Sequence, residues 1–238
     1  MKKKSVIILI IVAVIFISLI IFSIYYLNDY YKADDIVNDY LKSGDAVKVS
    51  NNNGTYFFDG YGEDNAIIFY PGGKVENKAY APLLYNLAKN GIDCFLIDMP
   101  FKLAIFNVNA ADSIVDNYTY KNWYMMGHSL GGVAVSMYTE KSKDIKGIIM
   151  LAAYPNNKIK DDIRLLSIYG SQDGVLNLKK YNDSKNNWNK ESYEIIIEGG
   201  NHSNFGYYGF QKGDKEPKVT REEQQKRTLN EIIKFVKL

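Results

Sequence analysis

The sequence predicts an α/β fold: a doubly wound, mostly parallel sheet flanked by helices and preceded by one transmembrane helix. Two observations carry this prediction. From residue 66 onward, short apolar runs bounded by turn residues alternate with stretches of helical pattern, and such unalternating runs are typical of strands buried on both faces. Near the N-terminus, an uncharged apolar run stands apart. The remainder of the 238 residues is long enough for one core of ordinary size.

The apolar run from Val6 to Leu27 follows Lys2, Lys3 and Lys4. At about 1.5 Å per residue, about 22 helical residues reach roughly 33 Å and cross a hydrocarbon core of about 30 Å. A cleaved signal peptide would be shorter and end at a small-residue site, which is not visible here. We therefore expect residues 1–27 to be a signal-anchor in the cell membrane, with a cytoplasmic N-terminus and an extracytoplasmic main domain.

Residues 28–45 read as a linker or edge helix, and residues 46–238 as the main domain. Two short runs around an Asn-Asn-Asn-Gly segment predict an opening hairpin. Six apolar runs predict the following strands: Ala66–Tyr70, Ile92–Ile97, Trp123–Met126, Gly147–Leu151, Leu165–Tyr169 and Tyr193–Ile197. Helices are expected over Lys78–Lys89, Ala110–Tyr118, Leu130–Lys141 and Leu176–Asn187, and from Thr220, which opens a capping box, to Val236.

Composition excludes several classes of function. Three of the 29 basic residues lie in the anchor, and the 26 that remain face 27 acidic residues, so no nucleic-acid partner is expected. The only cysteine, Cys94, lies in an apolar run and reads as a buried small hydrophobe. Two separated histidines and one cysteine offer no metal site, and no cofactor is implied.

The segment Gly127-His128-Ser129-Leu130-Gly131 places G-x-S-x-G between a predicted strand and a predicted helix. Such a sharp turn exposes its serine, and small neighbours allow close chain packing. Ser129 would also sit at a helix N-terminus, where free amides favour a developing oxyanion. Ser129 is therefore the candidate nucleophile, against the alternative of a plain glycine-rich turn.

A serine nucleophile needs a base to accept its proton. His128 adjoins Ser129 and is expected to pack or shape the turn, which leaves His202, at the end of the last predicted strand. The acid is expected between serine and histidine in chain order, and Asp173 follows the penultimate strand. The alternatives are Asp98, which precedes the serine, and the weaker Asp183.

Oxyanion donors are expected from the amides of Leu130 and Gly73, the latter in a Pro-Gly-Gly-Lys loop after the strand Ala66–Tyr70. Lys74 could replace Gly73 in this role. The loop is not a phosphate-binding loop, because the earlier glycine is missing and Val75 stands where Ser or Thr is needed.

Together, Pro-Gly-Gly, Gly-His-Ser-Leu-Gly-Gly, Gly-Ser-Gln-Asp-Gly and Gly-Gly-Asn-His resemble the α/β-hydrolase superfamily from residue 66 onward. Within it, the chain is similar to the compact dienelactone-hydrolase-like branch, with serine in place of the nucleophilic cysteine. The resemblance implies a hydrolase with Ser129, His202 and Asp173 as its triad. It implies no particular substrate.

Only about 13 residues separate the strands on either side of the usual cap position, so little or no cap is expected. Lys74, Tyr154, Phe205 and Tyr207 are candidate substrate-binding residues. The expected substrate is a small ester, or an acyl group on an envelope polymer, which makes the protein a carboxylesterase-like serine hydrolase. The alternatives are a non-catalytic, membrane-tethered binding module and an acyltransferase with the same triad.

Overall fold

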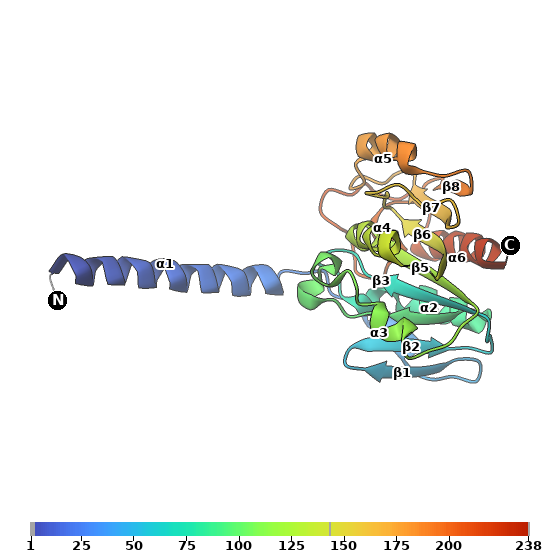
Figure 1. The fold of residues 1–238 in the computed structure, drawn as a ribbon, viewed down its shortest axis with the longest axis horizontal. Helices are drawn as coiled ribbons and strands as arrows, with labels where there is room; N and C mark the ends of the chain where they lie inside the picture. The colour runs from blue at the N-terminus through green and yellow to red at the C-terminus, as the bar shows by residue number, and fades with distance from the viewer. Residues whose placement is uncertain (1–2, 143, 238) are drawn as a thin grey trace. The chain divides into compact units, whose positions relative to one another are not determined.

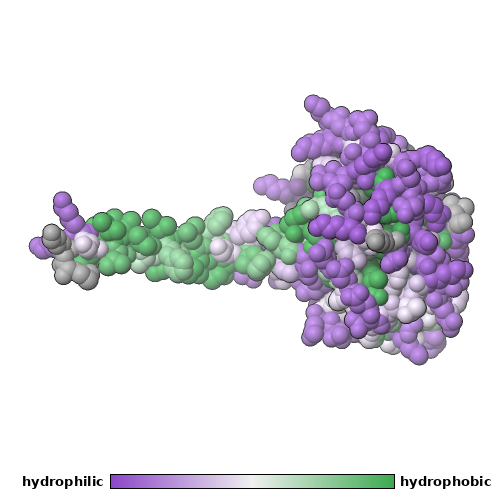
Figure 2. All heavy atoms as spheres, in the orientation of Figure 1, coloured by the Kyte–Doolittle hydropathy of each residue, from purple (hydrophilic) through white to green (hydrophobic). Residues whose placement is uncertain are grey.

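The computed structural model describes residues 3–142 and 144–237, which divide after Tyr30 into two units. The first unit contains helix α1 (Lys3–Asn28), whose side chains are apolar along nearly all of its length (Figure 2). None of its residues is buried within the protein. It is long and apolar enough to cross a membrane, as the sequence predicts.

The second unit is built on one eight-stranded sheet in the order β1-β2-β4-β3-β5-β6-β7-β8 (Figure 1). The antiparallel pairs are β1–β2 and β2–β4, and the other neighbours are parallel. The strands are β1 (Lys48–Asn52), β2 (Thr55–Asp59), β3 (Asn65–Tyr70), β4 (Asp93–Leu96), β5 (Asn122–His128), β6 (Ile145–Leu151), β7 (Arg164–Gly170) and β8 (Ser192–Ile197). The predicted doubly wound, mostly parallel sheet and the opening hairpin are confirmed.

Helices cover both faces of this sheet (Figure 1). Buried side chains of α2 and α6 belong to the core on one face, and those of α4 to the core on the other. The α-helices are α2 (Ala81–Lys89), α3 (Asp112–Val115), α4 (Leu130–Lys141), α5 (Leu178–Ser184) and α6 (Arg221–Lys237). Short 3₁₀ helices are η1 (Asp35–Leu41), η2 (Asn77–Tyr80), η3 (Pro100–Lys102), η4 (Ala104–Asn107), η5 (Lys185–Asn187) and η6 (Ser203–Phe205).

The apolar runs form strands because both faces of the sheet are buried. In β3, Ile67 and Phe69 join the core under α2 and α6, whereas Ile68 and Tyr70 join the core under α4. Successive side chains of a strand point to opposite faces, so a strand between two helical layers must be apolar at every position. Cys94 is fully buried in β4, as expected.

The order of the strands changes direction between β3 and β5. The chain passes from β3 outward to β4, returns to β5 on the other side of β3, and continues outward through β6, β7 and β8. Ligands of open α/β sheets bind beyond the carboxyl ends of the strands at such a switch point. The loops after β3 and β5 are therefore the expected location of a site.

Several elements differ from their predictions. Residues 31–45, which were expected to form part of a linker or edge helix, belong to the main unit and contain the 3₁₀ helix η1. Asp34 pairs with Arg221, and Tyr31 bridges to Val75. Helix α3 is shorter than expected. The expectation that every strand is buried on both faces fails for β8, which is the edge of the sheet and exposes Tyr193 and Ile196.

Candidate active site

Ser129 occupies a strained turn between the end of β5 and the start of α4. Its φ of 51° and ψ of −121° lie outside the regions that residues with a side chain ordinarily adopt. Its own N–H donates to Leu151 O at 2.9 Å, and its carbonyl accepts from Gly132 N at 3.0 Å. Both ends of the turn are thereby bound to the sheet and the helix, and the side chain of Ser129 is left partly exposed.

Glycines on either side of Ser129 allow this turn. A Cβ at Gly127 would lie 2.5 Å from the carbonyl carbon of Gly131, and one at Gly131 would lie 2.2 Å from the carbonyl oxygen of Tyr70. Atoms cannot approach so closely without movement of the backbone. The G-x-S-x-G spacing is therefore a packing requirement of this strand–turn–helix arrangement, as the sequence pattern suggested.

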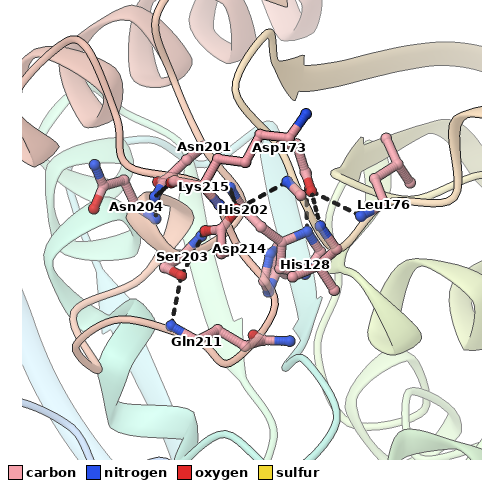
Figure 3. Close-up of polar contacts among 12 residues, drawn as sticks. His128, Asp173, Leu176, Asn201, His202, Ser203, Asn204, Gln211, Asp214 and Lys215 are labelled. Atoms are coloured by element: carbon pink, nitrogen blue, oxygen red, sulfur yellow. Dashed lines mark hydrogen bonds and ion pairs between the residues drawn. The ribbon is translucent and has the colours of Figure 1, made fainter.

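His202 and Asp173 form a buried pair beyond the ends of β8 and β7. His202 Nδ1 and Asp173 Oδ2 are 2.9 Å apart, and both side chains are almost fully buried (Figure 3). Asp173 Oδ1 accepts from the N–H groups of Val175 and Leu176 at 2.9 and 2.7 Å. Because the carboxylate can only accept, Nδ1 donates to it, which leaves Nε2 as the ring nitrogen that can exchange a proton with another group.

Asp214 joins the two loops that carry this pair, and it was not singled out from the sequence. Its Oδ1 accepts from the N–H groups of Gly174, His202 and Lys215 at 3.0, 3.3 and 2.9 Å. Its Oδ2 accepts from Ser203 N and Ser203 Oγ at 2.8 and 2.7 Å (Figure 3). Gly174 follows Asp173 directly, so one carboxylate holds both loops. The only feature of the sequence that could have pointed to Asp214 is its position in the long irregular segment between β8 and α6, since loops of such length are often functional.

Helix α6 is hydrogen-bonded to the loop that carries His202. Gln224 is fully buried; its Oε1 accepts from Asn201 N at 2.9 Å and its Nε2 donates to Asn201 O at 2.8 Å. Gln225 Nε2 donates to Asn204 O at 2.7 Å. The residues flanking His202 are thus attached to a regular helix, which limits movement of its ring.

His128 is fully buried behind the site. Tyr80 Oη accepts from Gly72 N at 3.1 Å and lies within hydrogen-bond distance, 2.8 Å, of His128 Nδ1. The rings of His128 and His202 are 4.6 Å apart. Burial, and then the neighbouring His202, hold the pKa of His128 well below its ordinary value. His128 is therefore neutral, in agreement with the packing role predicted for it.

Ser129 and His202 line the same cavity, of about 220 Å³. His202 Nε2 is buried and has no hydrogen-bond partner among the described residues. Catalytic hydrogen bonds are often long in unliganded enzymes. The rest of the lining is largely apolar: Leu130, Val133, Ala152, Ala153, Tyr154, Val175, Leu176 and Asn177. The connection from β6 to β7 contains no helix, so no cap covers the cavity there.

The loop after β3 approaches the start of α4. A Cβ at Gly73 would lie 3.0 Å from Leu130 Cδ2, and the half-buried Gly73 makes no backbone hydrogen bond through its N–H to the described chain. Leu130 is the first residue of α4, and the N–H of such a residue has no acceptor within its helix. Among the described residues, neither N–H has a backbone acceptor, and the two segments that carry them meet at the switch point.

The remaining candidates lie in different surroundings. Tyr154 lines the cavity with Ser129, but Lys74 does not. Lys74 has a φ of 58° and is bonded through its backbone to Tyr31 and Lys102. Phe205 is fully buried in the core near His128, and Tyr207 lines a separate hollow against α2 and α6. Both rings are buried by the path of the chain between β8 and α6. The sequence pattern could not indicate the direction of these side chains.

The alternative acids lie away from the histidine. Asp98 pairs with Lys102 at 2.8 Å, and Asp183 is exposed on α5. Within residues 3–142 and 144–237, no cluster of three His, Cys, Asp or Glu side chains could hold a metal ion. Two larger hollows, of about 810 and 720 Å³, contain neither Ser129 nor His202 in their lining.

A mostly parallel sheet flanked by helices, with a serine on a strained strand–turn–helix segment at its switch point, is typical of the hydrolase class of α/β proteins. The sequence matches the model of the Alpha/beta hydrolase family over residues 66–226. This match covers well over half of the chain, and the protein belongs to this family.

Solved structures share the fold at low sequence identity. Est1E from Butyrivibrio proteoclasticus is 15% identical, with a TM-score of 0.55 and coverage of 79% of this chain and 98% of its own. A predicted CIB-like hydrolase from Thermoplasma acidophilum is 20% identical, with a TM-score of 0.55 and coverage of 79% and 99%. An epoxide hydrolase from Vigna radiata is 10% identical, with a TM-score of 0.58 and coverage of 80% and 98%. No curated protein matches the sequence.

Proposed function

We propose that this protein is a membrane-anchored serine hydrolase that cleaves a carboxylic ester or a similar acyl bond. The observation that carries the proposal is the buried His202–Asp173 pair: His202 lines the cavity that Ser129 also lines, and its Nε2 has no hydrogen-bond partner among the described residues. Membership of the Alpha/beta hydrolase family supports hydrolytic chemistry.

In the first step, Ser129 Oγ attacks the carbonyl carbon of the ester while its proton passes to His202 Nε2. The electron pair of the carbonyl moves onto its oxygen, and the amides of Gly73 and Leu130 donate hydrogen bonds to this oxyanion. Asp173 holds the tautomer of His202 and stabilises the imidazolium that forms. When the tetrahedral intermediate collapses, the C–O bond breaks and the alcohol leaves with the proton from Nε2.

In the second step, water attacks the acyl-enzyme. His202 Nε2 accepts a proton from the water, and the second tetrahedral intermediate collapses to release the carboxylic acid. The proton returns from Nε2 to Ser129 Oγ, which restores the starting state. Transfer of the acyl group to another hydroxyl would use the same residues with that hydroxyl in place of water.

The cavity favours a short acyl group. Its volume of about 220 Å³ lies below the roughly 300–1,000 Å³ of sites for drug-sized ligands, and aliphatic side chains form much of its wall. We expect acetyl and butyryl esters to be cleaved faster than decanoyl or longer esters. A preference for long-chain esters in an acyl-length series would contradict this substrate class.

The proposal is tested by labelling residues 29–238 with a fluorophosphonate. Every buried core residue lies at Val37 or beyond, and α1 buries none of its own, so this part should fold without the anchor. We expect the wild type to be labelled and Ser129→Ala and His202→Ala to remain unlabelled. Ser50→Ala, at an exposed position of β1, is the matched control and should label normally.

The result has two clear readings. A folded wild type that neither labels nor hydrolyses short esters would contradict the proposal and favour a non-catalytic binding module. Labelling of Ser129→Ala at the wild-type rate would show that another residue is the nucleophile. Circular dichroism of each variant separates loss of reactivity from loss of fold.

The anchor is a separate part of the proposal. We infer that α1 spans the cell membrane with Lys3 and Lys4 on the cytoplasmic side and the main unit outside. In intact cells, added protease should digest the main unit. Complete protection would overturn this orientation, and recovery of the full-length chain in the soluble fraction would overturn the anchor itself.

A further inference from the structure

The connection between β4 and α3 carries an exposed apolar patch made of Phe101, Ile105 and Phe106. Their exposed fractions are 56%, 42% and 62%. The two phenylalanine rings meet edge to face, with centroids 5.7 Å apart. Contiguous apolar side chains at a surface mark interaction sites more often than single exposed residues do.

The backbone of this patch is strained. Phe101 and Lys102 both have a φ of 56°, in the left-handed region that bulky residues rarely adopt. Lys102 N donates to Met99 O at 3.0 Å, and Lys102 O accepts from Lys74 N at 2.8 Å. These bonds hold the strained turn in place, and the ring of Phe101 remains at the surface. Such strain is a reason to look for a function.

The patch lies close to the residue at which the main unit begins. Tyr31 N donates to Lys74 O at 2.7 Å, and Lys74 N in turn donates to Lys102 O. Only Asp29 and Tyr30 separate Tyr31 from Asn28, the last residue of α1. Because an extended chain spans at most about 3.5 Å per residue, Tyr31 lies within roughly 10 Å of the end of α1 in any arrangement of the two units.

We propose that the Phe101 patch inserts into the lipid interface of the membrane in which α1 is anchored. This inference rests on the proposed anchor, because the short tether requires the surface around Tyr31 to remain near the bilayer. Aromatic side chains are favourable at the membrane–water interface. Lys102 is paired with Asp98 at 2.8 Å, so the contact is apolar in character and does not require anionic lipid.

Docking of the patch would also fix where the active site lies. Leu103 follows the patch's first turn, and its Cδ2 would be 3.5 Å from a Cβ at Gly73. The proposed oxyanion loop is thus adjacent to the lipid-facing loop. The cavity of Ser129 is then held close to the membrane surface, and short acyl groups carried by molecules at that surface are its accessible substrates.

The test measures binding of residues 29–238, carrying Ser129→Ala, to phosphatidylcholine vesicles and to vesicles with added phosphatidylglycerol, by sedimentation. We expect binding to both. The double variant Phe101→Asn/Phe106→Ser should reduce the partition coefficient about tenfold or more, since two large apolar side chains are removed from the contact. Asparagine tolerates the left-handed conformation at position 101, so the fold should be retained.

The matched control is Tyr61→Ser. Tyr61 is 72% exposed and packs near Gly91, before the start of β4 and away from the carboxyl ends of the strands; it should leave binding unchanged. The proposal is overturned if the wild-type domain does not bind vesicles, if the double variant binds equally well, or if binding occurs only with phosphatidylglycerol. The assay lacks both α1 and Ser129, so its outcome is independent of the anchor and of catalysis.

Discussion

Replacement of Asp214 by asparagine tests whether this carboxylate positions the proposed catalytic residues. The side chain is half-buried and accepts five hydrogen bonds, three at Oδ1 and two at Oδ2. Asparagine has nearly the same shape but only one acceptor oxygen. Its NH₂ group would face donors at the position of the other oxygen, so at least two bonds would be lost whichever way the amide turns.

The expected cost follows from these lost bonds. A hydrogen bond to a charged group contributes about 1.5–3 kcal/mol, and partial exposure of Asp214 favours the lower end. Two lost bonds therefore lower the free energy of unfolding by about 3 kcal/mol. For a domain of this size the Tm should fall by roughly 6–12 °C. Movement of His202 by about 1 Å would also slow its reaction by about tenfold to a hundredfold.

The assay is the rate of fluorophosphonate labelling of Asp214→Asn, measured well below its Tm, together with thermal unfolding. Asp183→Asn is the matched control, because Asp183 is exposed and lies on α5, and it should behave as the wild type. If Asp214→Asn labels within twofold of the wild-type rate and unfolds at the same temperature, the positioning role assigned to Asp214 is wrong.

Three further predictions concern the turn and the two histidines. Asp173→Asn should slow labelling about a thousandfold with little loss of stability, because an amide no longer fixes the tautomer of His202. A change below tenfold would contradict the orienting role assigned to Asp173. Gly127→Ala should give insoluble or unfolded protein, since its Cβ would lie 2.5 Å from backbone atoms of Gly131; soluble protein with the wild-type midpoint of urea unfolding would contradict the packing. The lowered pKa of His128 means that the unfolded chain binds more protons below about pH 6.5, so stability should fall as pH falls through this value by up to about 1.4 kcal/mol per unit. Urea midpoints at pH 7.5 and 5.0 measure this loss, which His128→Gln should diminish; an equal loss in both proteins would contradict it.

Much of the fold could be predicted because the signals are local. The predicted helix Leu130–Lys141 has the observed bounds, and Thr220 Oγ1 caps α6 by accepting from Glu223 N at 3.1 Å. The bounds predicted for the parallel strands from the apolar runs agree with the observed bounds to within a few residues. The edge position of β8 could not be predicted, because an apolar run does not reveal whether a neighbouring strand or helix covers it.

The candidate site shows the same division. Ser129, His202 and Asp173 could be proposed because each follows a strand in a recognisable turn, and parallel strands bring their carboxyl ends together. Phe205 and Tyr207 are candidates because they are aromatic residues in the loop after His202, but neither lines the Ser129 cavity. Side-chain direction in an irregular loop depends on contacts with distant residues, which no local pattern contains.

The sequence by itself determined the apolar N-terminal helix, the alternation of strands and helices, and the glycine spacing around Ser129, since each depends on residues close together in the chain. Only the tertiary structure decided that Asp214 joins the loops of Asp173 and His202, and that Phe101 and Phe106 form a surface patch two hydrogen bonds from Tyr31. These relations join residues as far apart in the chain as Tyr31 and Phe101, and sheet and helix packing brings them together.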